Sequence, residues 1–207
     1  MSNYISDAVI KRLPRYRRYL KNLETAGTTR VSSKELGEMM DVTASQIRQD
    51  LNHFGGFGQQ GYGYSVSDLG DSLEKIMGVD KNYNIAFIGC GRLGQALIGY
   101  LIGHEPHYKI VALCDNRPSI AGTEIAGVKV MDKEAFKERM KQGDIDILAL
   151  TAPARVADEV AADLEGTGIR GVWNFGHTDI TIKGVHVMNV HLSDSLHALT
   201  YYINHLD

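Results

Sequence analysis

Cysteine is scarce in this sequence, since Cys90 and Cys114 are the only two among 207 residues. So few cysteines exclude a disulfide framework and a cysteine-rich metal site. Long apolar runs are also absent. None reaches the length of a transmembrane helix, and basic residues interrupt the first segment, where a signal peptide needs an apolar stretch. These absences predict a cytoplasmic globular protein with no membrane partner and no bound metal.

A strong excess of charge is also lacking, because the net charge is only −3, but the two parts of the chain differ. Residues 1–65 hold nine Lys and Arg against six Asp and Glu, whereas residues 66–207 hold thirteen against nineteen. A basic head on an acidic body favours a polyanionic partner for the head. A solvated helix face is the alternative explanation of the same basic residues.

The first segment has the pattern of an amphipathic helix. Its apolar side chains recur at helical spacing at Val9, Leu13, Tyr16, Leu20 and Leu23. Pro14 falls inside this pattern, and a proline at such a place either kinks a helix or forces it to restart. Gly27 follows the pattern and predicts the end of the helix.

Two capping boxes come next. Ser32 with Glu35, and Thr43 with Gln46, each place a hydroxyl three residues before a Glu or Gln, which is the arrangement that starts a helix. The second of these helices is expected over residues 44–54. Two short capped helices with a two-residue gap between them fit a helix-turn-helix.

A glycine-rich stretch follows over residues 55–64, where five glycines alternate with aromatic and amide residues. This composition is typical of a hairpin whose backbone approaches another molecule closely. After a helix-turn-helix it predicts the wing of a winged helix, and a plain surface loop is the alternative. A helix over residues 68–77, capped by Gly78, and a linker over residues 79–83 complete the first part.

From residue 84 onward strands and helices alternate. Strands are expected over residues 84–88, 109–114, 145–150, 169–174 and 185–190, and helices over residues 92–103, 132–142 and 155–165. The alternation predicts an α/β fold with a doubly wound parallel sheet. A last helix over residues 193–206, capped by Ser193, carries an apolar stripe that another subunit would bury. The stripe consists of Leu196, Leu199, Ile203 and Leu206.

The most informative motif is Gly89-x-Gly91-x-x-Gly94, which stands between an apolar strand and a helix. The first glycine permits a tight turn, the second lets the backbone approach a pyrophosphate, and the third lets the helix pack on the strand. Asp115 ends the next apolar run, where a carboxylate accepts hydrogen bonds from a ribose diol. Together these features predict a dinucleotide-binding domain.

Taken in order, these motifs make nearly the whole chain resemble the Rex family of redox-sensing transcriptional repressors. The likeness is carried by Lys11-Arg12-Leu13-Pro14, Gln46-Ile47-Arg48-x-Asp50-Leu51, Gly61-Tyr62-Gly63-Tyr64, Gly89-Cys90-Gly91-x-Leu93-Gly94 and Gly168-Ile169-x-Gly171. The resemblance implies a winged-helix DNA-binding domain over residues 1–80, a Rossmann-type NAD(H)-binding domain over residues 81–191, and a domain-swapped dimerisation helix over residues 192–207. It also implies a homodimer that binds palindromic operator DNA and is released by NADH, and that is not an enzyme.

On this resemblance the helix over residues 44–54 reads a major groove. Arg48 is the candidate for a bidentate contact with guanine, and Gln46 and Gln49 each match adenine. Many family members are basic at positions 49, 59 and 60, so the amides here favour an A·T-rich operator. The expected DNA contacts are Arg12, Arg15, Arg18, Ser33, Thr43, Ser45, Gln46, Arg48, Gln49, Phe57, Gln59, Gln60, Gly61 and Tyr62.

For the cofactor, NADH or NAD, the helix start at Cys90 to Leu93 is expected to hold the pyrophosphate. Asp115 is expected to bind the adenosine ribose and to disfavour a 2′-phosphate, although Arg117 nearby is compatible with NADP. Apolar residues around the nicotinamide favour the neutral ring of NADH over the cationic ring of NAD. The expected cofactor contacts are Gly89, Cys90, Gly91, Arg92, Leu93, Gly94, Tyr100, Asp115, Thr151, Ala152, Pro153, Asn174, Phe175, His191 and Leu192.

Alignment with the family further implies that Arg18, Tyr100 and His191 link the cofactor to the DNA-binding domain. Many relatives have an Asp where this chain has His191. Because histidine changes its charge near neutral pH, we expect the coupling here to depend on pH.

Three other interpretations fit parts of the sequence. An NAD-dependent oxidoreductase needs an acid–base pair, for which His177 with Asp179 is the candidate, but the first eighty residues have no role in such an enzyme. A sensor of another nucleotide, such as coenzyme A, is compatible with the fold, although Asp115 argues against a phosphorylated ribose. Cys90 and Cys114 end neighbouring strands, where they are either buried filler or direct sensors of oxidants.

Overall fold

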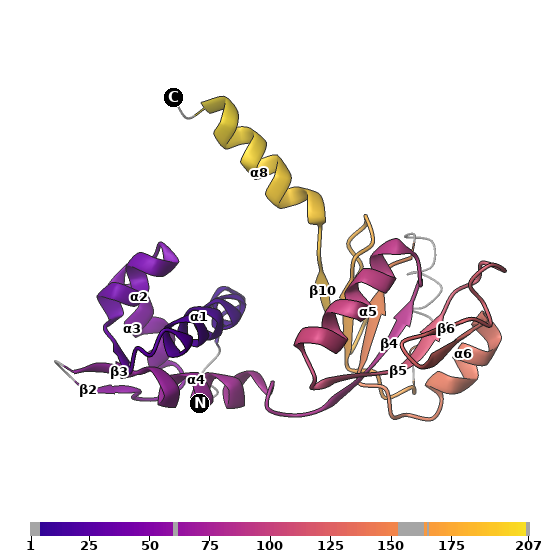
Figure 1. Ribbon diagram of the computed structural model, residues 1–207, viewed down its shortest axis with the longest axis horizontal. Coiled ribbons are helices and arrows are strands. Elements are labelled where there is room, and N and C mark those ends of the chain that lie inside the picture. Colours follow the sequence, from indigo (N-terminus) through magenta and orange to yellow (C-terminus); the bar gives the residue numbers. More distant parts are fainter. Residues whose placement is uncertain (1–4, 60–61, 153–163, 165, 206–207) are drawn as a thin grey trace. The chain divides into compact units, whose positions relative to one another are not determined.

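The computed structural model describes residues 5–59, 62–152, 164 and 166–205. The chain divides into two compact units, Met1–Lys81 and Asn82–Asp207. Figure 1 shows the first as a mainly helical unit and the second as a sheet with helices. Among the described residues, no helix is long and apolar enough to cross a membrane.

The first unit is a winged helix. It contains α1 (Asp7–Thr25), β1 (Arg30–Val31), α2 (Ser33–Met40), α3 (Ala44–Asn52), β2 (Gly58–Gln59), β3 (Gly63–Ser65) and α4 (Val66–Met77). The three short strands form an antiparallel sheet in the order β1-β3-β2. One apolar core joins the helices, and among its members are Leu13, Tyr16, Leu36, Ile47 and Leu69.

Helix α1 runs through Pro14 without a restart. The pyrrolidine ring is exposed, and the predicted apolar face (Val9, Leu13, Tyr16 and Leu20) is buried. Proline removes one backbone hydrogen bond from a helix interior. We infer that burial of this face offsets that loss, which is why the helix continues to Thr25.

The two predicted capping boxes have different outcomes. Ser32 and Glu35 form the complete reciprocal box at the start of α2. At the start of α3, the Thr43 hydroxyl accepts from the backbone N–H of Gln46 at 3.1 Å, but the Gln46 side chain turns away. Its Nε2 donates to Asp50 Oδ1 at 2.7 Å. The second box is therefore only half formed, because a buried carboxylate one turn further on takes the amide.

The second unit is a doubly wound α/β domain, as predicted. Its elements are β4 (Tyr83–Ile88), α5 (Arg92–His104), β5 (Tyr108–Cys114), β6 (Glu124–Ile125), β7 (Val128–Met131), α6 (Lys133–Met140), β8 (Ile147–Leu150), β9 (Gly171–Asn174), β10 (His186–Asn189) and α8 (Leu192–His205). The sheet order is β10-β9-β8-β4-β5-β7-β6. The chain leaves β4 in one direction through β5 and β7, and then returns to β8 on the other side. Ligands of open α/β sheets bind at the carboxyl ends of the strands at such a switch point.

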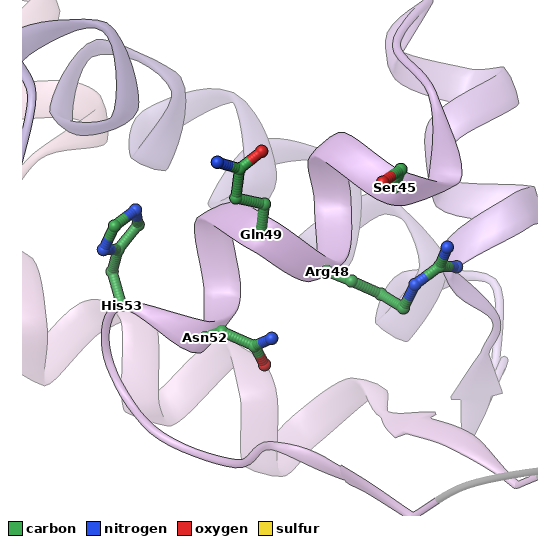
Figure 2. A pocket seen from close by; sticks show the side chains of 5 residues that line it. All are labelled: Ser45, Arg48, Gln49, Asn52 and His53. Atoms are coloured by element: carbon green, nitrogen blue, oxygen red, sulfur yellow. The ribbon is translucent and has the colours of Figure 1, made fainter.

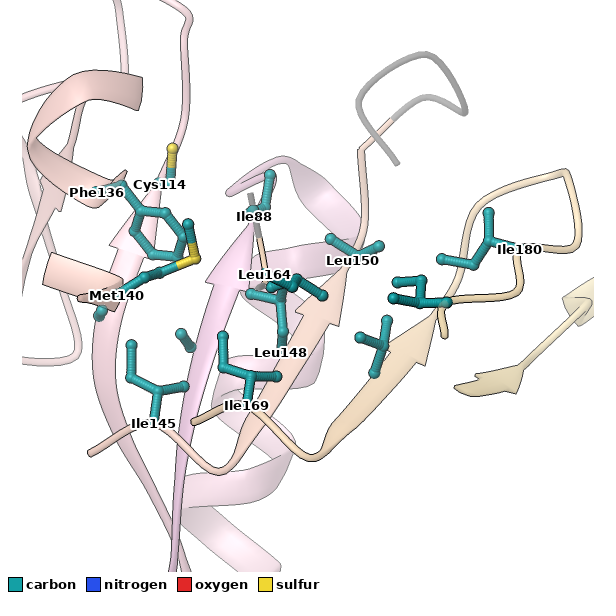
Figure 3. Packing of buried hydrophobic residues seen from close by; sticks show 14 residues of the cluster. Ile88, Cys114, Phe136, Met140, Ile145, Leu148, Leu150, Leu164, Ile169 and Ile180 are labelled. Carbon is teal, nitrogen blue, oxygen red and sulfur yellow. The ribbon is translucent and has the colours of Figure 1, made fainter. Parts of the chain in front are cut away.

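Apolar side chains cover both faces of this sheet. Along β4, Ile85 and Phe87 pack in one cluster with Ile98 of α5, whereas Ala86 and Ile88 pack in the other. Figure 3 shows the second cluster, in which α6 lays Phe136 and Met140 onto the strands. Burial on both faces of β4 explains its near-continuous apolar sequence.

Several element boundaries differ from the predictions. Helix α4 begins at Val66, two residues early, because Ser65 caps it through the N–H of Asp68. Strands β6 and β7 were not predicted, and they meet in a two-residue turn with positive φ at Ala126 and Gly127. Helix α8 begins at Leu192, so Ser193 is inside the first turn and is not its cap. The helix expected over residues 155–165 and Leu206 of the apolar stripe lie outside the described residues.

Candidate nucleotide and nucleic-acid sites

The glycine motif forms a tight junction between β4, α5 and the end of β8. Gly89 has φ +98°, and a Cβ there would lie 2.8 Å from the Thr151 carbonyl carbon. A Cβ on Gly94 would lie 2.2 Å from the Gly89 oxygen, and the Thr151 hydroxyl donates to that same oxygen. Glycine is therefore required at both positions by backbone contact, and Thr151, one of the expected cofactor contacts, lies against the motif.

The start of α5 is open to an anion. Gly91 is the N-cap, and no side chain in the described part of the chain caps this helix end. Backbone N–H groups at a helix N-terminus attract phosphate through hydrogen bonds and the helix dipole. Arg92 is exposed and Leu93 is half-buried at this turn. The helix start suits the expected pyrophosphate position except at Cys90, whose N–H donates to Asp115 Oδ2.

Asp115 lies beside this turn but does not present a free carboxylate. Its Oδ2 accepts from the Cys90 N–H at 2.7 Å. Arg117 donates through Nε to Oδ1 at 2.9 Å and through Nη2 to Oδ2 at 2.6 Å. These hydrogen bonds, led by those from Arg117, lower the pKa of Asp115 to about 2. Both oxygens that were expected to receive a ribose diol are thus engaged within the protein.

The carboxyl ends of β8 and β9 lie on the other side of β4 from β5, at the same edge of the sheet as the glycine motif. Asn174 is buried, donates from Nδ2 to the Thr178 carbonyl and to Asn189 Oδ1, and accepts from the Gly176 N–H. Its amide therefore holds the loop after β9. Phe175 packs edge-on against Trp173 at a centroid distance of 4.5 Å. Ala152 is half-buried, whereas Pro153 lies outside the described residues.

Each of the three residues expected to link the two sites has a contact within its own unit. The Tyr100 ring, half exposed, stacks on His104 at 4.8 Å. His191 Nε2 lies 2.7 Å from Asp179 Oδ1, so Asp179, the acid that an oxidoreductase would need beside His177, has a different histidine as its partner. Arg18 is exposed, and its guanidinium lies 5.6 Å from the centre of the Tyr19 ring.

The two cysteines are buried rather than presented to solvent. They belong to different apolar clusters, although Cys90 Sγ lies 3.6 Å from the Cys114 carbonyl oxygen. Burial raises the pKa of Cys90 to about 11 and that of Cys114 to about 12. Because the thiolate is the reactive form, these positions favour the role of buried filler over oxidant sensing.

In the first unit, Asp50 organises the buried side of the expected recognition helix α3. It accepts from Arg12 Nε at 2.6 Å and Nη2 at 2.8 Å, from the Tyr16 hydroxyl at 2.9 Å, and from Gln46. Burial by itself raises the pKa of Asp50, but these hydrogen bonds together lower it. Since a carboxylate only accepts, the Gln46 nitrogen must face Asp50, which fixes the orientation of the amide.

Two arginines expected to contact DNA hold the unit together. The Arg12 side chain is 23% exposed and is committed to fully buried Asp50. Arg15 Nη2 donates to the Met40 carbonyl at the end of α2, at 2.6 Å. The structure therefore places both guanidinium groups against neighbouring helices, and Arg18 alone of the three is exposed.

The exposed face of α3 forms a polar depression, which Figure 2 shows. It is lined by Ser45, Arg48, Gln49, Asn52 and His53. Arg48 Nη1 donates to the Ser33 hydroxyl at 3.0 Å and stays accessible. Asn52 and His53 were not predicted as site residues. The spacing of positions 45, 48, 49 and 52 is that of one helix face, and extension of this stripe would have found Asn52.

The hairpin β2–β3 forms the predicted wing. Tyr64 is buried and braces it, whereas Tyr62 is 69% exposed. Gly63 has φ +69°, and a Cβ there would lie 2.6 Å from the Val31 carbonyl oxygen. Arg30, which was not predicted as a site residue, donates from Nη1 to the Tyr62 carbonyl at 3.1 Å. Phe57 is half-buried, and the Gln59 side chain, Gln60 and Gly61 lie outside the described residues.

Comparisons with known proteins match both units. A family model described as "Putative DNA-binding protein N-terminus" matches residues 4–52. A second, described as "CoA binding domain", matches residues 80–178. The first match lies within the first structural unit, and the second begins two residues before the second unit.

Relatives that match over nearly their full length share the name redox-sensing transcriptional repressor Rex. The redox-sensing transcriptional repressor Rex of Caldicellulosiruptor bescii is 47% identical over 201 residues, which are 97% of this chain and 93% of the relative. The protein of the same name from Clostridium perfringens is 45% identical over 204 residues, covering 98% and 96%.

Solved structures agree with these relatives. The chain is similar to RSP in complex with β-NAD+ and operator DNA, with a TM-score of 0.89 and 46% identity, covering 98% of this chain and 94% of that one. It is also similar to RSP in complex with β-NADH, with a TM-score of 0.89 and 43% identity, covering 98% and 96%.

Proposed function

The chain belongs to the Rex family of redox-sensing transcriptional repressors, and we propose that it represses transcription by binding operator DNA and leaves the DNA when NADH binds. The observation that carries this proposal is the pairing of two sites in one chain. One is an exposed polar face on a recognition helix, and the other is an open helix start within a dinucleotide motif. RSP, which this chain matches over nearly its full length, has been crystallised with both kinds of ligand.

For DNA, we propose that α3 reads bases through its exposed face. Arg48 is the only Lys or Arg among the five side chains that line the depression, and its guanidinium matches the O6 and N7 acceptors of guanine. Gln49 matches adenine, whereas the amide nitrogen of Gln46 donates to Asp50 and so supports the helix. The amide character of this face supports an A·T-rich operator, and a homodimer would read it as a palindrome.

The wing supplies a second contact. The stretch over residues 55–64 contains no Lys or Arg. Arg30 is tied to the carbonyl of Tyr62 and so brings a positive charge to the uncharged hairpin. A narrow minor groove concentrates negative potential and attracts arginine. We assign Arg30 and exposed Tyr62 to the DNA surface, and Arg12 and Arg15 to the support of α2 and α3.

For the nucleotide, we propose that the start of α5 binds the pyrophosphate of NADH or NAD. The nicotinamide then extends toward the loops after β8 and β9, where Thr151, Ala152 and Phe175 lie. An apolar wall accepts the neutral ring of NADH, whereas the cationic ring of NAD loses hydration there. This difference allows one site to respond to the ratio of the two cofactors.

For assembly, we propose that α8 is exchanged between two subunits. All described residues of this helix are exposed, including Leu192, Leu196, Leu199 and Ile203. A helix that carries such an apolar stripe needs a covering surface. A homodimer in which each α8 covers the partner near the nicotinamide would meet this need and bring Leu192 to the cofactor.

The chain is proposed to act without catalysing a reaction. Asp179, the expected partner of His177 in an oxidoreductase, pairs with His191. Steady NADH oxidation with carbonyl substrates that is abolished by His177→Ala would contradict this proposal.

The decisive test is fluorescence-polarisation binding to palindromic A·T-rich duplexes, titrated separately with NADH and NAD. A ligand that favours the conformer unable to bind DNA lowers DNA affinity by its differential affinity for the two states. We expect sequence-dependent binding that NADH reverses at far lower concentration than NAD. Nucleotide binding without DNA binding at any salt concentration would overturn the proposed function.

A further inference from the structure

The end of β5 presents a guanidinium to a ligand instead of a carboxylate. The side chain of Asp115 is 4% exposed, whereas that of Arg117 is 51% exposed. Both carboxylate oxygens already accept hydrogen bonds, from Arg117 and from the Cys90 N–H. The pair as a whole is neutral, and its accessible part is the positive one.

Arg117 also covers the glycine turn. Its Nη2 and Nη1 lie 3.4 Å and 3.8 Å from the position that a Cβ on Gly91 would occupy. Gly91 is the N-cap of α5, where the proposed pyrophosphate site begins. The guanidinium therefore stands between the acid expected to meet the adenosine ribose and the turn expected to meet its phosphates.

The guanidinium retains hydrogen-bonding capacity at this place. A guanidinium has five N–H groups in a planar fork. The side-chain bonds to Asp115 use one on Nε and one on Nη2. Among the described residues no acceptor takes the other three, which belong to the two nitrogens near Gly91.

We propose that this site also accepts an adenosine ribose that carries a phosphomonoester, and that Arg117 binds this phosphate. The 2′-phosphate of NADPH and the 3′-phosphate of coenzyme A share this chemistry. A lone carboxylate repels such a dianion, whereas the neutral ion pair does not, and guanidinium–phosphate hydrogen bonds are strong and bidentate. The proposal rests on the nucleotide site of the proposed function and reverses the expectation that Asp115 excludes a phosphorylated ribose.

The test uses two ligand pairs whose members differ by one phosphate. Calorimetric titration of the full chain compares NADPH with NADH, and coenzyme A with 3′-dephospho-coenzyme A. In at least one pair, we expect the phosphorylated member to bind within about tenfold of the other or more tightly. Arg117→Gln should weaken that member about tenfold or more, as the loss of hydrogen bonds to a charged group predicts. The unphosphorylated member should change by less than about threefold.

Arg170→Gln is the matched control. Arg170 donates from Nη2 to Asp146 Oδ1 at 2.5 Å, an ion pair of the same kind that precedes β9 instead of following a strand. Arg170→Gln should leave all four affinities unchanged. Compared with Arg117→Gln, Arg117→Lys should restore part of the affinity for the phosphorylated ligand.

The outcomes separate this inference from the function on which it rests. The pair that responds to Arg117→Gln identifies the source of the phosphate. Equal weakening of NADH and NADPH would make Arg117 a pyrophosphate contact and overturn the inference. Binding of NADH with no binding of either phosphorylated ligand would overturn the inference alone. Failure of NADH to bind would overturn the proposed function itself.

Discussion

Each unit of the molecule contains a bidentate ion pair between an arginine and a buried aspartate, and the two pairs differ in what surrounds the arginine. In the DNA-binding unit, the Arg12 side chain is 23% exposed, and Asp50 also accepts hydrogen bonds from Tyr16 and Gln46. In the nucleotide unit, Arg117 is 51% exposed and lies over a glycine turn. We infer that the first pair is a fixed support for a helix and that the arginine of the second can also bind a ligand while it keeps its partner.

The comparison also shows why charge in the sequence is a poor guide to contacts. Arg12 and Arg15 belong to the most basic stretch of the chain, yet both guanidinium groups donate hydrogen bonds to neighbouring helices. Arg30 and Arg117 stand outside that stretch and remain more accessible. We therefore expect burial of the guanidinium, rather than local charge density, to distinguish supporting arginines from those that bind a ligand.

The largest effect is expected from removal of the buried acid. Asp50→Ala leaves Arg12, Tyr16 and Gln46 without their acceptor, and loss of one partner of a buried pair costs about 3–5 kcal/mol. Urea unfolding followed by circular dichroism should show the loss. The single tryptophan, Trp173, lies in β9 of the other unit, so its fluorescence transition should stay in place.

Glu138→Ala serves as the control for Asp50→Ala. Glu138 pairs with Lys141 on the surface, and exposed pairs of this kind contribute about 0–1 kcal/mol. An Asp50→Ala effect as small as that of Glu138→Ala would show that the Arg12–Asp50 pair is not a structural support.

The next effect concerns an arginine of the recognition face. Arg48→Ala should lower the affinity for operator DNA by about 1–3 kcal/mol and relax the choice at one base position. Arg48 is exposed and bonded only to the Ser33 hydroxyl among the described residues, so unfolding should be unaffected. Competition with duplexes that vary one base pair at a time measures both the loss of affinity and the change in base preference. A uniform loss over all sequences would make Arg48 a phosphate contact instead.

The third effect is a dependence of the stability of the nucleotide unit on acidic pH. Hydrogen bonds lower the pKa of Asp115 to about 2, chiefly those from the Arg117 side chain and also those from the backbone N–H groups of Arg117 and Cys90. The pair therefore stabilises the fold fully above the ordinary aspartate pKa and loses this contribution as the pH falls from about 4 to about 2. We expect wild type to lose about 2 kcal/mol of unfolding free energy over this range, and Arg117→Gln to lose less because only the backbone hydrogen bonds to Asp115 remain. Unfolding followed by Trp173 fluorescence between pH 5 and pH 2 measures the difference, and identical pH profiles would show that the pair does not stabilise the fold.

The smallest effect is expected at the wing. If Arg30 contacts a phosphate or the minor groove, Arg30→Gln reduces the slope of log affinity against log salt by about 1 and weakens all sequences alike. Lys137→Gln makes the same change of charge in the other unit and should leave the slope unchanged. Equal slopes for wild type and Arg30→Gln would remove Arg30 from the DNA surface.

Local pattern predicted much of this molecule. The winged helix, the doubly wound sheet and the glycine motif follow from periodicity, capping residues and strand-to-helix order, and the structure confirms them. The Gln46–Asp50 hydrogen bond is also local, because side chains four residues apart share a helix face. Strands β6 and β7 were missed because they are too short to show an alternation of their own.

Contacts between distant residues could not be predicted in the same way. Arg12 and Asp50 are 38 residues apart, and their pairing depends on how α1 packs on α3. Arg117 is close to Asp115 in the sequence, yet its position over Gly91 depends on the turn between β4 and α5. The motif therefore predicted a dinucleotide-binding domain, whereas the proposal for Arg117 required the folded side chains.

The most direct test of the central claim is calorimetric titration of the full chain with NADH, in the absence and in the presence of saturating operator DNA. Coupling between two sites is reciprocal, so NADH must bind more weakly to the DNA-bound protein by the same factor by which it weakens DNA binding. We predict that equality of factors. An NADH affinity that does not change when operator DNA is bound would contradict a repressor that NADH releases.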